Sequence, residues 1–167
     1  MIAYKFLRAD GTSVFTSFRW ELPADGPGPW VEAPVEPCRS GVHACRIADL
    51  PLWVSRSLFE IELGGEIVED RTKVLASRAR LLRRVDAWDD RARDEYVRMC
   101  ADRAHELART ASPPLPDWER VIEPSIREGP ALLGFIAARI AEAASGVDAY
   151  RAERARQSAW LADRLAL

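Results

Sequence analysis

The histidine and cysteine residues of this chain are concentrated in one short segment. Cys38, His43 and Cys45 lie within eight residues of one another, whereas Cys100 and His105 lie far downstream. On a β-strand, His43 and Cys45 project from the same face because they are two residues apart. Imidazole and thiol groups bind zinc, and they also form nucleophile–base pairs in enzymes. The cluster therefore marks a candidate site.

Three interpretations of this cluster stay open, and the first is a zinc site. Its ligands would be Cys38, His43 and Cys45, with Cys100 or His105 as the fourth. The spacing C-x4-H-x-C is not a standard zinc pattern, and the chain has no CxxC motif. The sequence therefore predicts no metal. If a metal is bound, its predicted ligands are Cys38, His43 and Cys45.

The second interpretation is catalytic, with His43 as a general base beside the thiol of Cys38. Cys45 is a poorer partner for His43, because residues two apart on a strand are separated by about 7 Å at Cα. In the third interpretation, Cys45 is a small buried apolar residue and His43 is a half-buried histidine of the core.

Paired carboxylates and arginines lie further along the chain. Glu60 and Glu62 share a face of a predicted strand, and they can divide acid and base roles with His43 if that strand lies beside residues 41–46. Arg80 belongs to a row of arginines that can bind an anionic group such as phosphate. Cross-strand ion pairs with the glutamates are the alternative.

A long loop over residues 21–38 contains five prolines and two glycines, which prevents a continuous helix or central strand. Loops of this length are often lids or binding segments. Trp30 lies in the loop in a Pro-Gly-Pro-Trp context, where an aromatic ring can cover a pocket. We therefore expect Trp30 to contact a ligand at the candidate site.

Alternating apolar residues predict a mainly antiparallel sheet in residues 1–85. Asp10-Gly11 favours a hairpin between 2–9 and 12–20. A short helix, capped by Asp49, follows the strand that carries His43. The other predicted strands are 30–33, 41–46, 58–63, 66–69 after a turn at Gly64-Gly65, 73–75 and 79–85.

Residues 89–167 show a helical period instead. This region is predicted to form about three helices, over 89–110, 130–145 and 148–165, with a short helical stretch near 118–127. Gly146 is the expected cap that ends the second of these, and Asp148 the cap that begins the last. A stripe of small residues on the last helix predicts a close helix contact, and it consists of Ala152, Ala155, Ala159 and Ala162.

Together these patterns predict an α+β fold in a single domain over 1–167, with helices packed against the sheet. The chain has 167 residues, 48% of them hydrophobic, and a net charge of −2, which disfavours nucleic acid as a partner. It shows no signal peptide and no membrane-spanning run, so we expect a cytoplasmic protein that does not bind membranes. Three cysteines fit reduced thiols better than disulfides.

Residues 1–85 resemble a family of uncharacterised phage and bacterial domains. The resemblance rests on motifs that occur in the same order: Pro37-Cys38, Gly41-Val-His-Ala-Cys45, Asp49-Leu-Pro-Leu-Trp53, Leu58-Phe-Glu-Ile-Glu-Leu-Gly-Gly65 and Lys73-Val-Leu-Ala-Ser77. Val42 stands where the family usually has an aromatic residue. The family implies a cysteine, a Gly-x-His-Ala-Cys strand and a short helix, but no activity.

The order strand, short helix, strand over residues 41–63 is also remotely similar to ADP-ribosyltransferase-like folds. That similarity implies a nucleotide-like ligand and transferase chemistry. Arg8 and His43 would then contact the dinucleotide, and Glu60 or Glu62 would hold a ribose hydroxyl.

The sequence thus predicts a small enzyme or ligand-binding domain with a pocket at Cys38, His43 and Cys45, roofed by the 21–38 loop; it identifies no cofactor. The alternative is a protein-interaction module without catalysis, which uses the C-terminal helices to bind a partner or a second copy as a homodimer.

Overall fold

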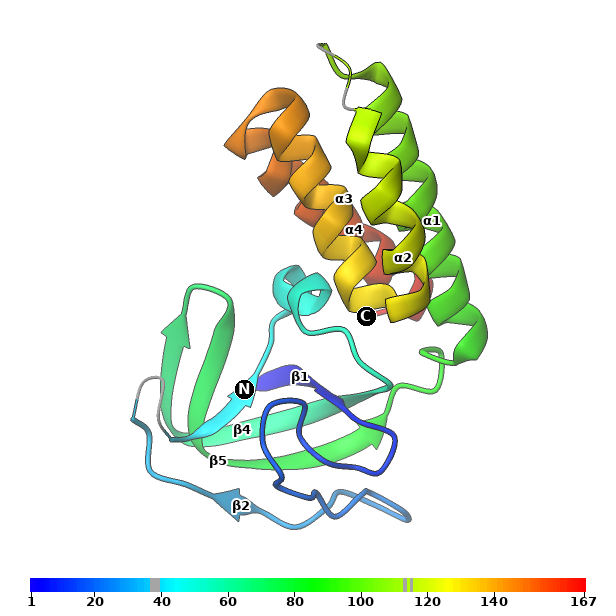
Figure 1. Cartoon of the computed structure of the whole chain (residues 1–167). Coiled ribbons are helices and arrows are strands. Elements are labelled where there is room, and N and C mark those ends of the chain that lie inside the picture. Colours follow the sequence, from blue (N-terminus) through cyan, green and yellow to red (C-terminus); the bar gives the residue numbers. More distant parts are fainter. Residues whose placement is uncertain (37–39, 113, 115) are drawn as a thin grey trace. The chain divides into compact units, whose positions relative to one another are not determined.

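A computed structural model describes residues 1–36, 40–112, 114 and 116–167. The chain forms two compact units, Met1–Trp88 and Asp89–Leu167. The first contains an antiparallel sheet and the second contains helices (Figure 1). The fold is therefore α+β, as the sequence predicts.

The sheet is built around the long strands β4 (Ser57–Asp70) and β5 (Lys73–Arg84), which pair antiparallel. The strand β1 (Ile2–Leu7) lies along the free edge of β4. Two short strands, β2 (Val31–Glu32) and β3 (Val42–Ala44), pair with the other edge of β5. The order of the main path is β1-β4-β5-β2.

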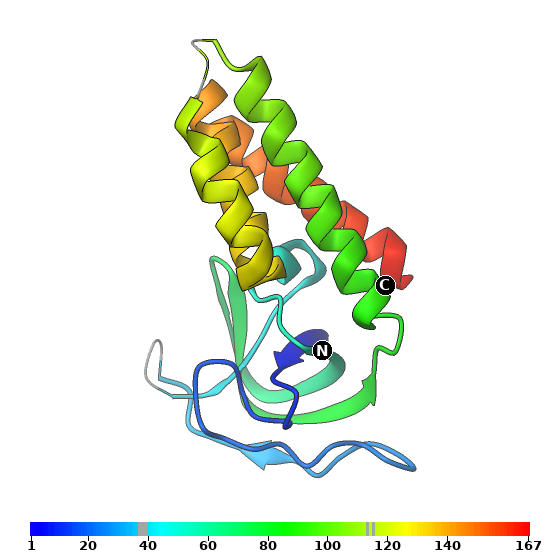
Figure 2. The same cartoon turned by 45° about the vertical axis from the view of Figure 1, so that its right-hand side comes forward.

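The sheet curls until its two edges meet. The backbone amide of Tyr4 in β1 donates to the carbonyl of Cys45 at 2.9 Å, and the amide of Cys45 donates to the carbonyl of Tyr4 at 2.8 Å. The path β1-β4-β5-β3 therefore returns to β1 through one isolated bridge. Figure 2 shows β4 and β5 bending together along their length.

Apolar side chains fill the concave side of this sheet. The buried core cluster consists of Ala3, Leu7, Trp20, Val42, Ala44, Phe59, Ile61, Leu63, Val74, Ala76, Ala79 and Leu81. Alternate residues of each strand enter the cluster, as the period of a strand requires. Trp88 packs elsewhere in this unit, edge-on against Phe6 at 5.9 Å between ring centroids.

Three local predictions for this unit are wrong. Residues 12–20 are not a regular strand: the segment pairs only at Leu7–Ser13 and Thr12–Arg19, and Phe15 is 74% exposed. Gly64-Gly65 does not form a turn between two strands. The pairing of β4 with β5 instead shifts its register between Gly64 and Ile67, within one continuous strand. Residues 73–85 consequently form one strand, β5, and not two.

A further wrong prediction concerns the start and the cap of the short helix. It is a 3-10 helix, η1 (Ile47–Leu52), which begins before Asp49, and no side chain caps it. The carboxylate of Asp49 instead accepts a hydrogen bond from Nε of Arg46 at 2.6 Å. The side chain of Arg46 thus binds the carboxylate of Asp49, which the sequence predicted to cap the helix.

The described residues of the second unit contain five helices, where the sequence predicts about three. They are α1 (Asp90–Thr110), η2 (Pro116–Trp118), α2 (Glu119–Glu128), α3 (Pro130–Ser145) and α4 (Val147–Leu165). Gly146 ends α3 as predicted, with φ of 86°. Asp148 is not a cap, because α4 begins one residue before it. No helix in the described parts of the chain is both long and apolar enough to cross a bilayer.

The buried face of α4 is polar, which the sequence does not indicate. Three of the predicted small-residue positions, Ala152, Ala155 and Ala159, are exposed. The buried residues of α4 are Glu153, Gln157, Ser158, Leu161 and Leu165. Small residues line α3 instead, which packs against α1, α2 and α4.

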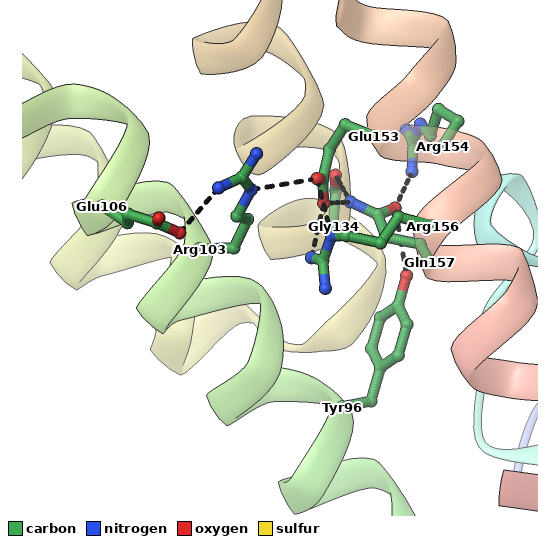
Figure 3. Close-up of polar contacts among 8 residues, drawn as sticks. All are labelled: Tyr96, Arg103, Glu106, Gly134, Glu153, Arg154, Arg156 and Gln157. Carbon is green, nitrogen blue, oxygen red and sulfur yellow. Dashed lines mark hydrogen bonds and ion pairs between the residues drawn. The ribbon is translucent and has the colours of Figure 1, made fainter. Parts of the chain in front are cut away.

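A hydrogen-bonded network satisfies these buried polar groups (Figure 3). The carboxylate of Glu153 is bound by Arg156 at both oxygens, at 2.8 and 2.7 Å, and lies 3.5 Å from Nε of Arg103. The amide of Gln157 donates to the Gly134 carbonyl and to Glu153, each at 2.9 Å. A buried carboxylate is tolerated only when such partners surround it.

Candidate functional site

A cavity of about 370 Å³ lies in the N-terminal unit, on the side where β1 meets β3. Its walls come from residues 4–6 of β1, residues 40–45 around β3, segments 13–20 and 31–33, and Trp53 after η1. A volume of this size is typical of small-molecule pockets, which take ligands of about 300–1,000 Å³. The cavity therefore defines the candidate site.

Lys5 is the one formally cationic residue among the described residues that line the cavity. Because β1 alternates, Lys5 lies on the same face as Ala3 and Leu7, which belong to the apolar core. Its ammonium group donates to the carbonyl of His43 at 2.6 Å and lies 5.2 Å from the Trp20 ring centroid. Within the described residues it forms no ion pair with a carboxylate. Desolvation lowers the pKa of Lys5 from 10.5 to about 8.

His43 lines the same cavity from β3. Its Nε2 atom is buried and has no hydrogen-bond partner among the residues that the structure describes. Burial lowers the pKa of His43, and the charges of Lys73 and Lys5 lower it further. The imidazole is therefore neutral at pH 7, and its Nε2 atom is closed off from solvent.

Aromatic rings form much of the cavity wall. Phe15 packs edge-on against Trp53 and Phe18 against Trp20, with ring centroids 5.5 and 5.4 Å apart. The indole of Trp20 donates to Ser13 Oγ at 3.0 Å, and that of Trp53 to the carbonyl of Thr72 at 2.7 Å. The two indoles are thus held in fixed orientations around an apolar space with an amine and an imidazole.

Cys45 lines the cavity but is chemically inert. It is 2% exposed, and its thiol donates to the carbonyl of Tyr4 at 3.3 Å. Burial raises the pKa of the thiol to about 12, so the nucleophilic and metal-binding thiolate does not form near pH 7. Cys38 lies outside the described residues. Among the residues that the structure describes, no three histidine, cysteine, aspartate or glutamate residues lie together in a way that could hold a metal ion.

Glu60 and Glu62 do not reach His43. The strand β3 pairs with β5 and not with β4, so the neighbourhood on which their acid–base role depended does not exist. Neither glutamate lines the cavity. Glu60 ion-pairs with Arg83 at 2.6 Å and Glu62 with Arg80 at 2.7 Å, which is the cross-strand alternative.

The three predicted ligand-binding residues lie outside the cavity lining. Trp30 is stacked with two arginines: the guanidinium carbons of Arg78 and Arg80 lie 4.7 and 4.8 Å from its ring centroid. Arg8 donates to the carbonyl of Val14 at 2.6 Å and thereby supports the segment that borders the cavity. The wall expected from the 21–38 loop is formed mainly by segment 13–20.

Sequence reasoning missed Lys5. A signal was present, because Lys5 stands between Ala3 and Leu7 on the apolar face of a strand, where a lysine is rarely buried without a partner. It is also one of only two lysines among 24 basic residues, the other being Lys73.

Comparisons of the chain with family models, curated proteins and solved structures gave no match. The similarity to phage and bacterial domains, and the remoter one to ADP-ribosyltransferase-like folds, therefore stay predictions. The observations define an α+β chain with a ligand-sized aromatic cavity in its β-rich unit.

Proposed function

We propose that the N-terminal unit binds a small organic molecule with a flat apolar body and an oxygen-bearing polar end. The observation that carries this proposal is that the ammonium group of Lys5, which has unused hydrogen-bond donors, lines an aromatic cavity. An ammonium group has three donors, and the His43 carbonyl occupies one of them. A ligand oxygen is the natural partner for the remaining donors.

Charge favours an anionic or strongly polarised oxygen at that end of the ligand. The other formally charged residue among the described lining residues is Glu32, which is exposed, so the ammonium of Lys5 lacks a counter-ion. Hydrogen bonds from an ammonium to a carboxylate are about twice as strong as neutral ones. The flat body of the ligand would lie against the rings of Trp20 and Trp53. We further propose that this binding takes place in the cytoplasm, which fits reduced cysteines.

The test is a binding titration of the full chain with 2-naphthoate and its neutral counterpart 2-naphthamide, followed by tryptophan fluorescence. We expect naphthoate to bind at least about tenfold more tightly than naphthamide, which corresponds to one charge-assisted hydrogen bond. Lys5→Met should remove this preference.

Lys73→Met is the matched control, because Lys73 is the other lysine and does not line the cavity. It should bind naphthoate like the unmodified chain. The proposal is wrong if neither ligand binds, or if Lys5→Met binds naphthoate as tightly as the unmodified chain does.

A further inference from the structure

The cavity presents a primary amine in apolar surroundings. Lys5 Nζ is held at 2.6 Å by a backbone carbonyl, lies beside the Trp20 ring, and is not neutralised by a carboxylate in the described part of the chain. Lysines that form imines in enzymes are placed in this way, because an apolar wall disfavours the ammonium and exposes the lone pair.

We propose that Lys5 forms a reversible imine with an aldehyde bound in this cavity. This inference rests on the proposed function and deepens it, because it names the polar end of the ligand as an aldehyde group.

The amine is neutral often enough to react. With its pKa at about 8, roughly a tenth of Lys5 is unprotonated at pH 7, whereas a lysine with the ordinary pKa is unprotonated in less than about one molecule in a thousand. The fixed carbonyl of His43 also limits the positions of Nζ, so the amine meets a bound ligand from a defined direction.

The step balances without any further reagent. After the ammonium releases one proton to solvent, the Nζ lone pair forms a bond to the aldehyde carbon, and the π electrons of the carbonyl move to its oxygen. That oxygen collects both hydrogens of the amine and leaves as water, which gives R–CH=N–Lys5. No atom is oxidised or reduced, and water reverses the reaction.

The other titratable groups that line the cavity are compatible with this step. Tyr4 on β1 and Cys45 directly after β3 have raised pKa values and stay neutral, and Glu32 on β2 is exposed. His43 on β3 has a lowered pKa, so its imidazole is neutral and adds no charge. Among the described lining residues, none adds a negative charge next to Lys5 that would hold it protonated.

The amino-acid composition allows each reactive site to be followed separately, because the chain has three primary amines: Lys5, Lys73 and the N-terminus. The full chain is treated at pH 7 with 2-naphthaldehyde and cyanoborohydride, which reduces an imine to a stable secondary amine. Peptide mass spectrometry then gives the rate of labelling at each amine. We expect Lys5 to be labelled at least about tenfold faster than Lys73.

Two variants and one unfolded sample complete the design. Lys5→Arg keeps the charge and should remove the fast label, while Lys73→Arg should leave it unchanged. In 8 M urea the selectivity for Lys5 should disappear. In the native chain, equal labelling of the lysines, or no label on Lys5, overturns the imine.

The failure of this inference can be distinguished from failure of the proposed function. If 2-naphthoate binds in a Lys5-dependent way but the aldehyde is not trapped at Lys5, the cavity binds ligands without covalent chemistry. If naphthoate does not bind and Lys5 is not selectively labelled, both proposals are wrong. Selective labelling of Lys5 supports the imine whether or not naphthoate binds.

Discussion

Replacing Lys5 by methionine should make the N-terminal unit more stable near neutral pH. Methionine has a similar length and no charge, so it removes the desolvation of the ammonium while keeping the core filled. Lowering the pKa of a lysine from 10.5 to about 8 corresponds to roughly 3 kcal/mol. Loss of the hydrogen bond to the His43 carbonyl lowers this gain in stability by about 1 kcal/mol. The expected net gain in the free energy of unfolding is therefore about 2 kcal/mol at pH 7.

The pH dependence of this difference has a definite sign. Below pH 8 the lysine is charged in both the folded and the unfolded chain, so the whole penalty is present. Between pH 8 and 10.5 the folded chain releases its proton first, and the penalty falls. Above pH 10.5 it is gone. The advantage of Lys5→Met over the unmodified chain should therefore shrink across this window, while groups common to both proteins cancel.

Hydrogen exchange of β1 and β4 peptides, measured in the full chain at several urea concentrations, reports the stability of this unit separately from that of the helices. Lys73→Met is the control, and we expect no gain from it because Lys73 is paired with Asp70 at 3.7 Å. The reasoning is refuted if Lys5→Met is less stable than the unmodified chain at pH 7, or if the difference between them does not change between pH 7 and 10.5.

Three further predictions concern buried groups. Glu153→Ala should cost about 1–3 kcal/mol in urea unfolding, because it leaves the buried amide of Gln157 and the half-buried guanidinium of Arg156 without their acceptor. Arg151→Ala, in an exposed pair, should cost less than about 0.5 kcal/mol, and equal effects would contradict the network. Gly134→Ala should lower the melting temperature of the helices, since its Cβ would lie 2.8 Å from the Tyr96 hydroxyl. An unchanged melting temperature would contradict this prediction and show that the Tyr96 ring moves aside. Cys45 should resist iodoacetamide at pH 7.5 in the folded chain and react in urea, and rapid labelling of the folded chain would show that the thiol is accessible.

The helices could be predicted largely from local sequence, because their ends carry local signals. Asp89 caps α1 by accepting from the amide of Ala92 at 2.7 Å, and Gly146 ends α3 with a positive φ. Which face of α4 is buried could not be predicted in this way. Burial of Glu153 depends on Arg156 and Arg103, and Arg103 comes from another helix about fifty residues away.

The sheet was harder to predict, since strand neighbours are set by contacts between distant residues. Nothing local to residues 42–44 indicates that β3 pairs with β5, and this pairing is what separates His43 from Glu60. His43 was located correctly as a residue of a short strand, although its role stays a prediction. Lys5 was missed because its surroundings come from distant parts of the chain: the His43 carbonyl that it binds and the Trp20 ring beside it.

The closure of the sheet also bears on how the cavity can change shape. β1 is held along its whole length by β4, but its backbone meets the end of β3 through one pair of hydrogen bonds, between Tyr4 and Cys45. The side chains add two more bonds, from Lys5 to the carbonyl of His43 and from Cys45 to the carbonyl of Tyr4. Breaking these few bonds separates the two walls of the cavity without unpairing β1 from β4. Such a local opening exposes far less apolar surface than global unfolding, so it occurs at a much lower free energy. We therefore expect the backbone amides of Tyr4 and Cys45 to exchange their hydrogens at a lower free energy of opening than the amides within the β1–β4 ladder.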